Sequence, residues 1–145
     1  MKISSSVFEN NGSIPSEYTC DGSDISPPLT ISEIPTESKT LAIIMDDPDA
    51  PMGTFTHWVV WNISPKKTEF TKGEKISFPQ GKTSFGLKSY GGPCPPGGTH
   101  RYFFKLYALD VILNLKEGAS KDDLEKAMKG HIISETSLMG KYSRR

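Results

Sequence analysis

Short apolar runs occur in the first half of the chain, and their lengths predict strands rather than helices. Leu41 to Met45 is a continuous apolar run of the length of a buried strand. His57 to Ile63 is rich in tryptophan and valine, which favours a strand that packs on both faces. We therefore expect these two segments to be central strands of a sheet.

From Thr99 onward, apolar and polar residues alternate, which predicts a third central strand. One face would carry His100, Tyr102, Phe104, Leu106 and Ala108, and the other Arg101, Phe103, Lys105, Tyr107 and Leu109. The first face is the more apolar. His100 and Tyr102 are therefore expected to share the core side of the strand, with Arg101 pointing away from them.

Weaker patterns predict further strands around these three. They fall at Met1 to Phe8, Leu29 to Ile31, Ile76 to Phe78 and His131 to Tyr142. Prolines and glycines interrupt the pattern between Ser64 and Tyr90, so mainly loops are expected there, with a short edge strand at residues 76–78.

One segment, Lys121 to Lys129, has the signals of an α-helix. Ser120 is a suitable N-cap, and Gly130 can end the helix. Asp122 and Asp123 lie in the first turn, where the helix dipole favours negative charge. Many short strands with one late helix predict a mainly β fold, an antiparallel β-sandwich.

Size and charge narrow the classes of protein. With 145 residues the chain is predicted to be a single domain, residues 1–145. Its 17 basic and 17 acidic residues give a formal net charge of zero, which argues against a nucleic-acid partner. No apolar run approaches the roughly 18 residues of a membrane span, and the N-terminus lacks the apolar region of a signal peptide. We expect a cytoplasmic protein, not integral to a membrane.

The predicted cytoplasmic location also bears on the oxidation state of the two cysteines, Cys20 and Cys94. A reducing compartment favours free thiols, so we expect both to be reduced. Because Cys94 lies within a run of glycines and prolines, a reactive or bridging role stays open for it.

The end of the first central strand carries candidate chemistry. Asp47 is followed by Pro48 and then Pro51, so Asp47 and Asp49 are expected on a stiff loop rather than in a helix or strand. This loop leads to His57, at the start of the next strand. A carboxylate pair held rigidly beside a histidine is typical of a functional site.

A second candidate stretch, GGPCPPGG, precedes Thr99 and allows a ligand to approach the backbone closely. DPDAP followed by HWVVWNI, and then GGPCPPGGTHRYFFKLYALD, resemble the two signature regions of the phosphatidylethanolamine-binding protein family, which includes the Raf kinase inhibitor protein. TCDGSDISPPL and SFPQGKTSFGLKSYGGPCPP resemble its bacterial and archaeal branch. The similarity runs from about Cys20 to Gly140. It implies a β-sandwich with a Greek-key connection and peripheral helices.

The resemblance also implies a small anion-binding pocket at one edge of the sandwich. Carried over residue by residue, the pocket contains Asp47, Pro51, His57, His100 and Tyr102, with Gly92 and Pro93 at its mouth. Imidazole N–H groups, a tyrosine hydroxyl and backbone N–H groups can hold a phosphate, sulfate or carboxylate. A bound anion favours protonated histidines, so binding should weaken as the pH rises past their pKa.

Other residues are expected to support this pocket. Asp47 would accept a hydrogen bond from one imidazole and fix its tautomer. Arg101 could hold the acidic loop through a bidentate ion pair with Asp49 or Asp47. Trp58 is expected in the core, with the pocket rim as the alternative. The resemblance implies a cis peptide bond between Ala50 and Pro51.

The function that this resemblance implies is non-enzymatic. The protein would bind the phosphate of a phospholipid headgroup, a phosphorylated peptide or a nucleotide, with no cofactor and no metal. Contacts around the pocket could inhibit a kinase or a protease. The sequence ends with GKYSRR, without the long C-terminal helix of the animal branch, and the MGTFT linker from Pro51 to His57 is short. The mouth is therefore expected to be more open, and a homodimer could cover it.

Three alternatives stay open. Asp47, His57 and His100 could form the two-histidine, one-carboxylate metal site of an enzyme. A hydrolase could use the same pocket with Cys94 or a serine as nucleophile, although the sequence has no G-x-S-x-G motif. Alternatively, the two histidines could be core residues whose hydrogen bonds are satisfied internally.

Overall fold

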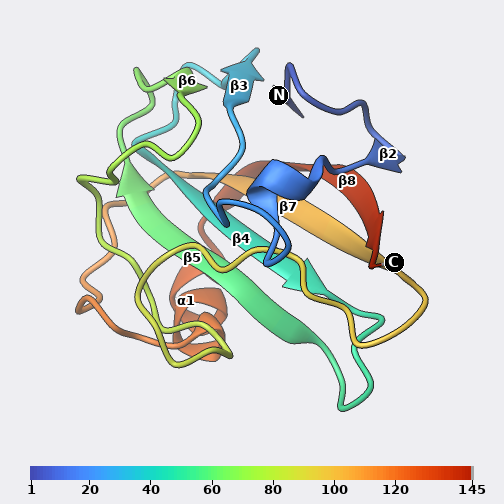
Figure 1. Cartoon of the computed structure of the whole chain (residues 1–145). Coiled ribbons are helices and arrows are strands. Elements are labelled where there is room, and N and C mark those ends of the chain that lie inside the picture. The colour runs from blue at the N-terminus through green and yellow to red at the C-terminus, as the bar shows by residue number, and fades with distance from the viewer. Residues whose placement is uncertain (145) are drawn as a thin grey trace.

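The computed structural model describes residues 1–144, which form two β-sheets and one α-helix (Figure 1). In chain order the elements are β1 (Lys2–Ser4), β2 (Gly12–Ser13), the 3₁₀ turn η1 (Ser16–Tyr18), β3 (Leu29–Ser32), β4 (Thr40–Asp47), β5 (Phe55–Ile63), β6 (Glu69–Phe70), β7 (Thr99–Leu109), α1 (Lys121–Met128) and β8 (Ile132–Ser143). Neither helical segment of this part of the chain is long and apolar enough to cross a membrane.

The two sheets pack against each other. The larger has five strands in the order β2-β8-β7-β4-β5, and the smaller has three in the order β1-β3-β6. Neighbouring strands are antiparallel, except that β2 pairs with β8 in parallel. The predicted mainly β sandwich with one short helix near the C-terminus is confirmed.

Strand β4 runs through the middle of the molecule, which explains its continuous apolar sequence. Ile43 and Met45 belong to the core between the two sheets. Ala42 and Ile44 face the other way and join a second core cluster with Leu124 of α1. Because sheet covers one face of β4 and helix the other, all eight of its residues are buried.

Strand β7 has the alternation that its sequence predicts. His100 and Tyr102 are buried with the three apolar residues that follow on the same face, whereas Arg101 is exposed. Only one face of this part of β7 packs into the core, so polar residues persist on the other. The side of the strand that carries the two candidate site residues was therefore predicted correctly.

Helix α1 begins where the capping residues place it. The Asp123 backbone N–H donates to Ser120 Oγ at 3.1 Å, and the Ser120 N–H donates to Asp123 Oδ2 at 3.3 Å, a reciprocal capping box. Lys121 Nζ lies 3.2 Å from Oδ2 of the buried Asp46, which ties the helix to β4. The helix ends at Met128, one residue before the predicted end.

The weaker strand predictions need correction. Of residues 1–8 only Lys2–Ser4 form a strand, because the pairing with β3 ends at the Ser4–Thr30 pair. The edge strand expected at residues 76–78 is wrong. Glu69–Phe70 instead pair with β3, and the Ile76 and Phe78 side chains pack on the core from a loop.

The candidate site residues lie at one end of the larger sheet. Strand β4 ends there at Asp47, which pairs with Phe55 at the start of β5. In Figure 1 the loop between these strands projects at the lower right, and the yellow segment leading into β7 passes along the same end. Asp47 therefore belongs to the strand and not to the loop, contrary to the sequence prediction, whereas Asp49 lies in the turn that follows.

Candidate functional site

A cavity of about 420 Å³ opens at this end of the sheet. Its walls are formed by Asp47, residues 50–55, His57, Ser84, Phe85, residues 94–96, His100 and Tyr102. Five predicted site residues are thus brought together: Asp47, Pro51, His57, His100 and Tyr102. Apart from Pro51 they are buried, and they project from three neighbouring strands, β4, β5 and β7.

The closest polar contact in the cavity joins His100 to Asp47. Nδ1 of His100 lies 2.6 Å from Asp47 Oδ2, so the ring donates this hydrogen bond to the carboxylate. The other carboxylate oxygen of Asp47 accepts from the Asp49 backbone N–H at 2.7 Å. The contact that the sequence predicts between Asp47 and one imidazole is thus present, with His100 as the imidazole.

His57 is held in a similar way, but by the backbone. Its Nδ1 lies 2.7 Å from the carbonyl oxygen of Gly91, and the Gly91 N–H donates to the His57 carbonyl at 3.0 Å. Since a carbonyl can only accept, Nδ1 carries the proton. Burial is the main cause that lowers the pKa of His57 below 6.5, outweighing the opposing hydrogen bond to Gly91 and the nearby Asp47.

Both rings therefore leave Nε2 as the nitrogen available to a ligand. Among residues 1–144, neither Nε2 atom has a hydrogen-bond partner. A neutral imidazole in this tautomer offers a lone pair at Nε2, and a protonated one offers an N–H. The cavity can thus accept or donate a hydrogen bond at two positions, depending on the protonation of His57 and His100.

Tyr102 lies between the two histidines. Its ring meets His57 edge-on with centroids 5.2 Å apart, and stacks on His100 at 6.4 Å. Burial, and secondarily the charge of Asp47, raises the pKa of Tyr102 well above its ordinary value of 10.0. The phenol therefore stays protonated and serves as a hydrogen-bonding group.

Outside the cavity, Arg101 holds the acidic turn. Its Nε donates to Asp49 Oδ2 at 2.9 Å and its Nη2 to Asp49 Oδ1 at 2.8 Å. The bidentate pair is the predicted one, with Asp49 as its partner. The hydrogen bonds from Arg101 lower the pKa of Asp49 to about 2. Arg101 thus steadies the turn whose N–H group bonds to Asp47.

The glycine-proline segment lies differently from the prediction. Gly92 and Pro93 are buried below the surface and do not line the cavity, which is instead lined by residues 94–96. The Gly92 N–H donates to Asp24 Oδ1 at 2.7 Å. An added Cβ at Gly92 would lie 2.3 Å from the Tyr18 carbonyl oxygen. Glycine is required there for close packing rather than for contact with a ligand.

The two cysteines form a disulfide bond, so the expectation that both are reduced is wrong. Cys20 and Cys94 have their Cα atoms 5.4 Å apart although 74 positions separate them in the sequence. The Cys20 N–H also donates to the Pro93 carbonyl at 3.1 Å, so the two segments already run side by side. Cys94 lines the cavity, and the bond removes its thiol as a nucleophile.

Two further expectations have definite outcomes. Residues 1–144 contain no cis peptide bond, so the expectation of one between Ala50 and Pro51 is wrong, and the turn around Pro51 closes with a trans bond.

Trp58 is a core residue rather than part of the rim. Only 1 % of its surface is exposed, and its Nε1 donates to Gln80 Oε1 at 3.0 Å.

The apolar rim of the cavity was not predicted. Phe55 and Phe85 meet edge-on at 4.8 Å, and each also packs against the ring of His57. Met52, in the loop that follows Pro51, lines the cavity and is 98 % exposed. The signal in the sequence was the presence of Met52, Phe55 and Phe85 in or next to loops, where polar residues are expected.

The open alternatives can be compared with this geometry. Within residues 1–144, no three His, Cys, Asp or Glu side chains are arranged to hold a metal ion. Nδ1 of His100 is directed at Asp47, so these two residues contact each other instead of converging on a third atom. Ser84 Oγ in the cavity accepts from the Thr56 N–H at 2.8 Å and makes no hydrogen bond to either histidine.

The sequence matches a family described as "Phosphatidylethanolamine-binding protein" over residues 4–143. Among relatives, the chain is 54 % identical to UPF0098 protein PH1269 of Pyrococcus horikoshii, with 97 % of this chain and 76 % of that protein covered. It is 49 % identical to a UPF0098 protein of Methanothermobacter thermautotrophicus, with 99 % of each covered.

Two solved structures share the whole fold. The phosphatidylethanolamine-binding protein homologue CT736 of Chlamydia trachomatis superimposes with a TM-score of 0.96 at 42 % identity, covering 99 % of this chain and 97 % of that one. The Escherichia coli protein YbcL, described as a member of the mammalian PEBP family, superimposes with a TM-score of 0.91 at 25 % identity, covering 99 % and 98 %.

Proposed function

The chain belongs to the phosphatidylethanolamine-binding protein family, and from this premise we propose that it binds a small phosphate-bearing or carboxylate ligand at His57 and His100 without chemical turnover. The observation that carries the proposal is the matched orientation of the two imidazoles. Each donates its Nδ1 proton to an acceptor in the protein, which leaves Nε2 free for a ligand in the cavity that both rings line.

Binding of an anion at this site involves protons. Two neutral imidazoles offer only lone pairs, and the neighbouring Asp47 is negative, so a fully ionised anion is repelled. A ligand overcomes this repulsion either by donating its own P–O–H to Nε2 or by causing a histidine to take up a proton. Both routes predict that affinity falls as the pH rises.

The walls of the cavity support a ligand that is more than a bare anion. Phe55, Phe85 and Met52 form an apolar rim above the polar base. An ester whose phosphate reaches the histidines would place its organic group against these side chains, where burial of apolar surface stabilises the complex. A phosphorylated side chain or a phospholipid headgroup satisfies this description.

A binding role is favoured over an enzymatic one by the chemistry of the cavity. Catalysis by a covalent route needs a nucleophile activated by a base. Cys94 is oxidised in the disulfide, and within the described chain Ser84 makes no hydrogen bond to a histidine. Inhibition of a kinase or a protease stays a prediction of the family resemblance. The cytoplasmic location and the homodimer stay predictions from the sequence.

The test is calorimetric titration with inorganic phosphate and phosphoethanolamine. We expect saturable binding to the unmodified protein that is lost in His57→Ala and His100→Ala. His131→Ala is the matched control, because its imidazole pairs with Asp110 far from the cavity, 46 % exposed. Turnover of a phosphate ester that disappears in His100→Ala would show an enzyme instead. Equal affinity in all three variants would refute the site.

A further inference from the structure

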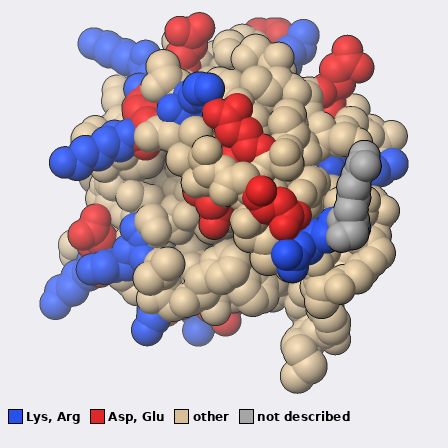
Figure 2. All heavy atoms as spheres, in the orientation of Figure 1, with Lys and Arg blue, Asp and Glu red and all other residues tan. Residues whose placement is uncertain are grey.

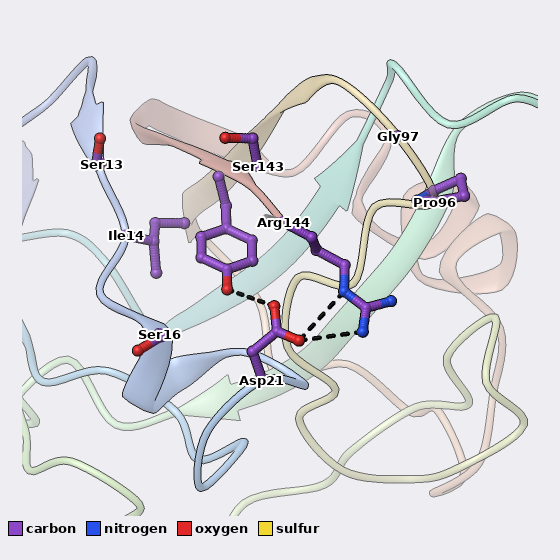
Figure 3. A pocket seen from close by; sticks show the side chains of 9 residues that line it. Ser13, Ile14, Ser16, Asp21, Pro96, Gly97, Ser143 and Arg144 are labelled. Carbon is purple, nitrogen blue, oxygen red and sulfur yellow. Dashed lines mark hydrogen bonds and ion pairs between the residues drawn. The ribbon is translucent and has the colours of Figure 1, made fainter.

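A second and larger cavity, of about 840 Å³, lies directly beside the histidine cavity. The two share one wall residue, Pro96. Figure 3 shows this second cavity between the Pro96–Gly97 segment, the end of β8 with Ser143 and Arg144, and the segment around Asp21. Anything that extends from the histidine cavity across Pro96 enters it. We call this second cavity the Arg144 cavity.

Asp21 and Arg144 form its polar centre. Arg144 approaches Asp21 Oδ1 with Nε at 3.2 Å and Nη2 at 3.1 Å, and the Tyr142 hydroxyl donates to Asp21 Oδ2. Both oxygens of the carboxylate are therefore occupied by donors. The guanidinium has further N–H groups beyond these two contacts. In Figure 3 it lies between Asp21 and the Pro96–Gly97 segment.

The ridge between the two cavities consists of Pro96, which lines both, and two glycines without side chains, Gly97 and Gly98. Residues 96–98 are exposed, and an added Cβ at Gly97 or Gly98 would meet no atom within 4 Å. Within residues 1–144, no hydrogen bond uses the backbone groups of this short segment. The N–H groups of Gly97 and Gly98 and the C=O groups of the segment are thus available to another main chain, whereas Pro96 has no N–H.

The disulfide fixes the two cavities relative to each other. Cys94 lines the histidine cavity, and Cys20 immediately precedes Asp21 of the Arg144 cavity. The bond therefore joins the wall of one to the wall of the other. A ligand that spans both meets a surface that is already ordered, which reduces the entropy cost of binding.

From these observations we propose that the histidine cavity and the Arg144 cavity bind one extended peptide. Its phosphorylated residue occupies the histidine cavity, its main chain crosses residues 96–98, and an acidic side chain near the phosphorylated residue pairs with Arg144. This inference rests on the proposed function, because it takes the phosphate-binding role of His57 and His100 as given.

A peptide suits this surface better than a nucleic acid or a membrane. Lys and Arg are interspersed with Asp and Glu on the face that Figure 2 displays, without the basic stripe that a polyanion needs. The Arg144 cavity presents a guanidinium and the exposed hydroxyls of Ser13, Ser16 and Ser143, while its carboxylate is already paired. Such an excess of donors suits carboxylates and peptide carbonyls.

The experiment compares two synthetic, fluorescently labelled peptides of equal length by anisotropy. Each carries one phosphoserine, which is flanked on both sides by glutamate in the first peptide and by glutamine in the second. We expect the unmodified protein to bind the acidic peptide about five-fold more tightly, the size of a partly exposed ion pair. Arg144→Gln should abolish this preference, and Arg144→Lys, which keeps the charge, should retain most of it.

The control is Lys129→Gln, which removes the same charge from an exposed position at the C-terminal end of α1. It should leave the preference unchanged. The inference is wrong if the unmodified protein shows no preference, if Arg144→Gln keeps it, or if Lys129→Gln removes it equally. Arg144-dependent binding of phosphatidylserine vesicles without peptide preference would point to a membrane surface and would also overturn it.

Competition by inorganic phosphate separates this inference from the proposed function. In one outcome, phosphate binds the unmodified protein and Arg144→Gln equally, and the unmodified protein shows no preference for the acidic peptide. This result refutes only the Arg144 cavity as a second site. Phosphate that neither binds nor competes refutes the proposed function of the histidine cavity, and the peptide inference fails with it.

Discussion

Nδ1 of His100 lies 2.6 Å from Oδ2 of Asp47, and both side chains are almost fully buried although 53 positions separate them in the sequence. Asp47 ends β4 and His100 lies near the start of the neighbouring β7, so the sheet brings them together. The second oxygen of Asp47 is bonded to the Asp49 N–H. This carboxylate therefore has defined partners on both sides and fixes the imidazole that faces the ligand.

Asp47→Asn should weaken both folding and binding. Both carboxylate oxygens of Asp47 accept a hydrogen bond, one from His100 and one from the Asp49 N–H. The amide of asparagine has one oxygen and one NH₂ group, so it can accept only one of these two bonds. A buried polar group left unsatisfied costs about 1–3 kcal/mol. We expect a loss of that size in urea unfolding and a loss of phosphate affinity of about ten-fold, typical of residues that orient a binding imidazole.

The matched control is Asp110→Asn. Asp110 makes the same type of contact with His131 at 2.9 Å, but both side chains are about half exposed. A change below about 0.5 kcal/mol is expected there. Equal effects of the two substitutions would contradict the special role of Asp47.

Stability should fall as the pH drops below about 6.5 because of His57. Burial lowers the folded-state pKa of His57 below its value of 6.5 in the unfolded chain. Between the two values the unfolded state binds more protons, so the free energy of unfolding rises with pH across this window and is lower on its acid side. Urea unfolding of the unmodified protein and of His57→Gln between pH 5 and pH 8 measures this contribution.

The free energy of unfolding should rise less steeply with pH in His57→Gln than in the unmodified protein, across the range between the folded and unfolded pKa values of His57. Added phosphate should also flatten it in the unmodified protein, because a bound anion stabilises the protonated ring. A pH dependence that is unchanged in the variant would show that His57 does not contribute to it.

The disulfide should make a large contribution to stability. It closes a loop between residues 74 positions apart, for which chain-entropy arguments give about 4 kcal/mol. Calorimetry with and without a dithiol reductant should show a lower melting temperature on reduction. The Cys20→Ser, Cys94→Ser double variant should match the reduced protein and show no further response to reductant.

Two glycines of the same loop should respond differently to alanine. At Gly92 a Cβ would lie 2.3 Å from the Tyr18 carbonyl oxygen and 2.5 Å from Asp24 Oδ1, so Gly92→Ala should destabilise the protein by at least about 2 kcal/mol. Gly97→Ala is the control, because its Cβ would meet no atom within 4 Å. Chemical denaturation of both variants provides the comparison, and similar losses would contradict the packing role of Gly92.

Local sequence patterns were sufficient for the central elements. The apolar run of β4, the alternation of β7 and the capping signals around Ser120 each reflect a force that acts within a few residues. The strand faces followed from the period of two, which is why the exposure of Arg101 could be predicted. Its partner was limited to Asp49 or Asp47, the candidate carboxylates of the proline-braced loop.

Features that depend on long-range packing could not be predicted from the sequence. The disulfide depends on Cys20 lying beside Pro93, which no local pattern encodes. Gly92 was expected at the mouth because the family resemblance implied it, but glycine also suits close packing inside a protein, which is its role here. Strand β6 has only two residues, too short for any period to be visible.

The account depends most on the two imidazoles acting together on one ligand. NMR of the three histidine side chains during a phosphate titration tests this directly, since His131 lies elsewhere and serves as an internal reference. We predict that the signals of His57 and His100 shift together, with one saturation curve, while those of His131 stay in place. Signals of His57 and His100 that do not move at millimolar phosphate would show that both rings are structural, and would contradict the central claim.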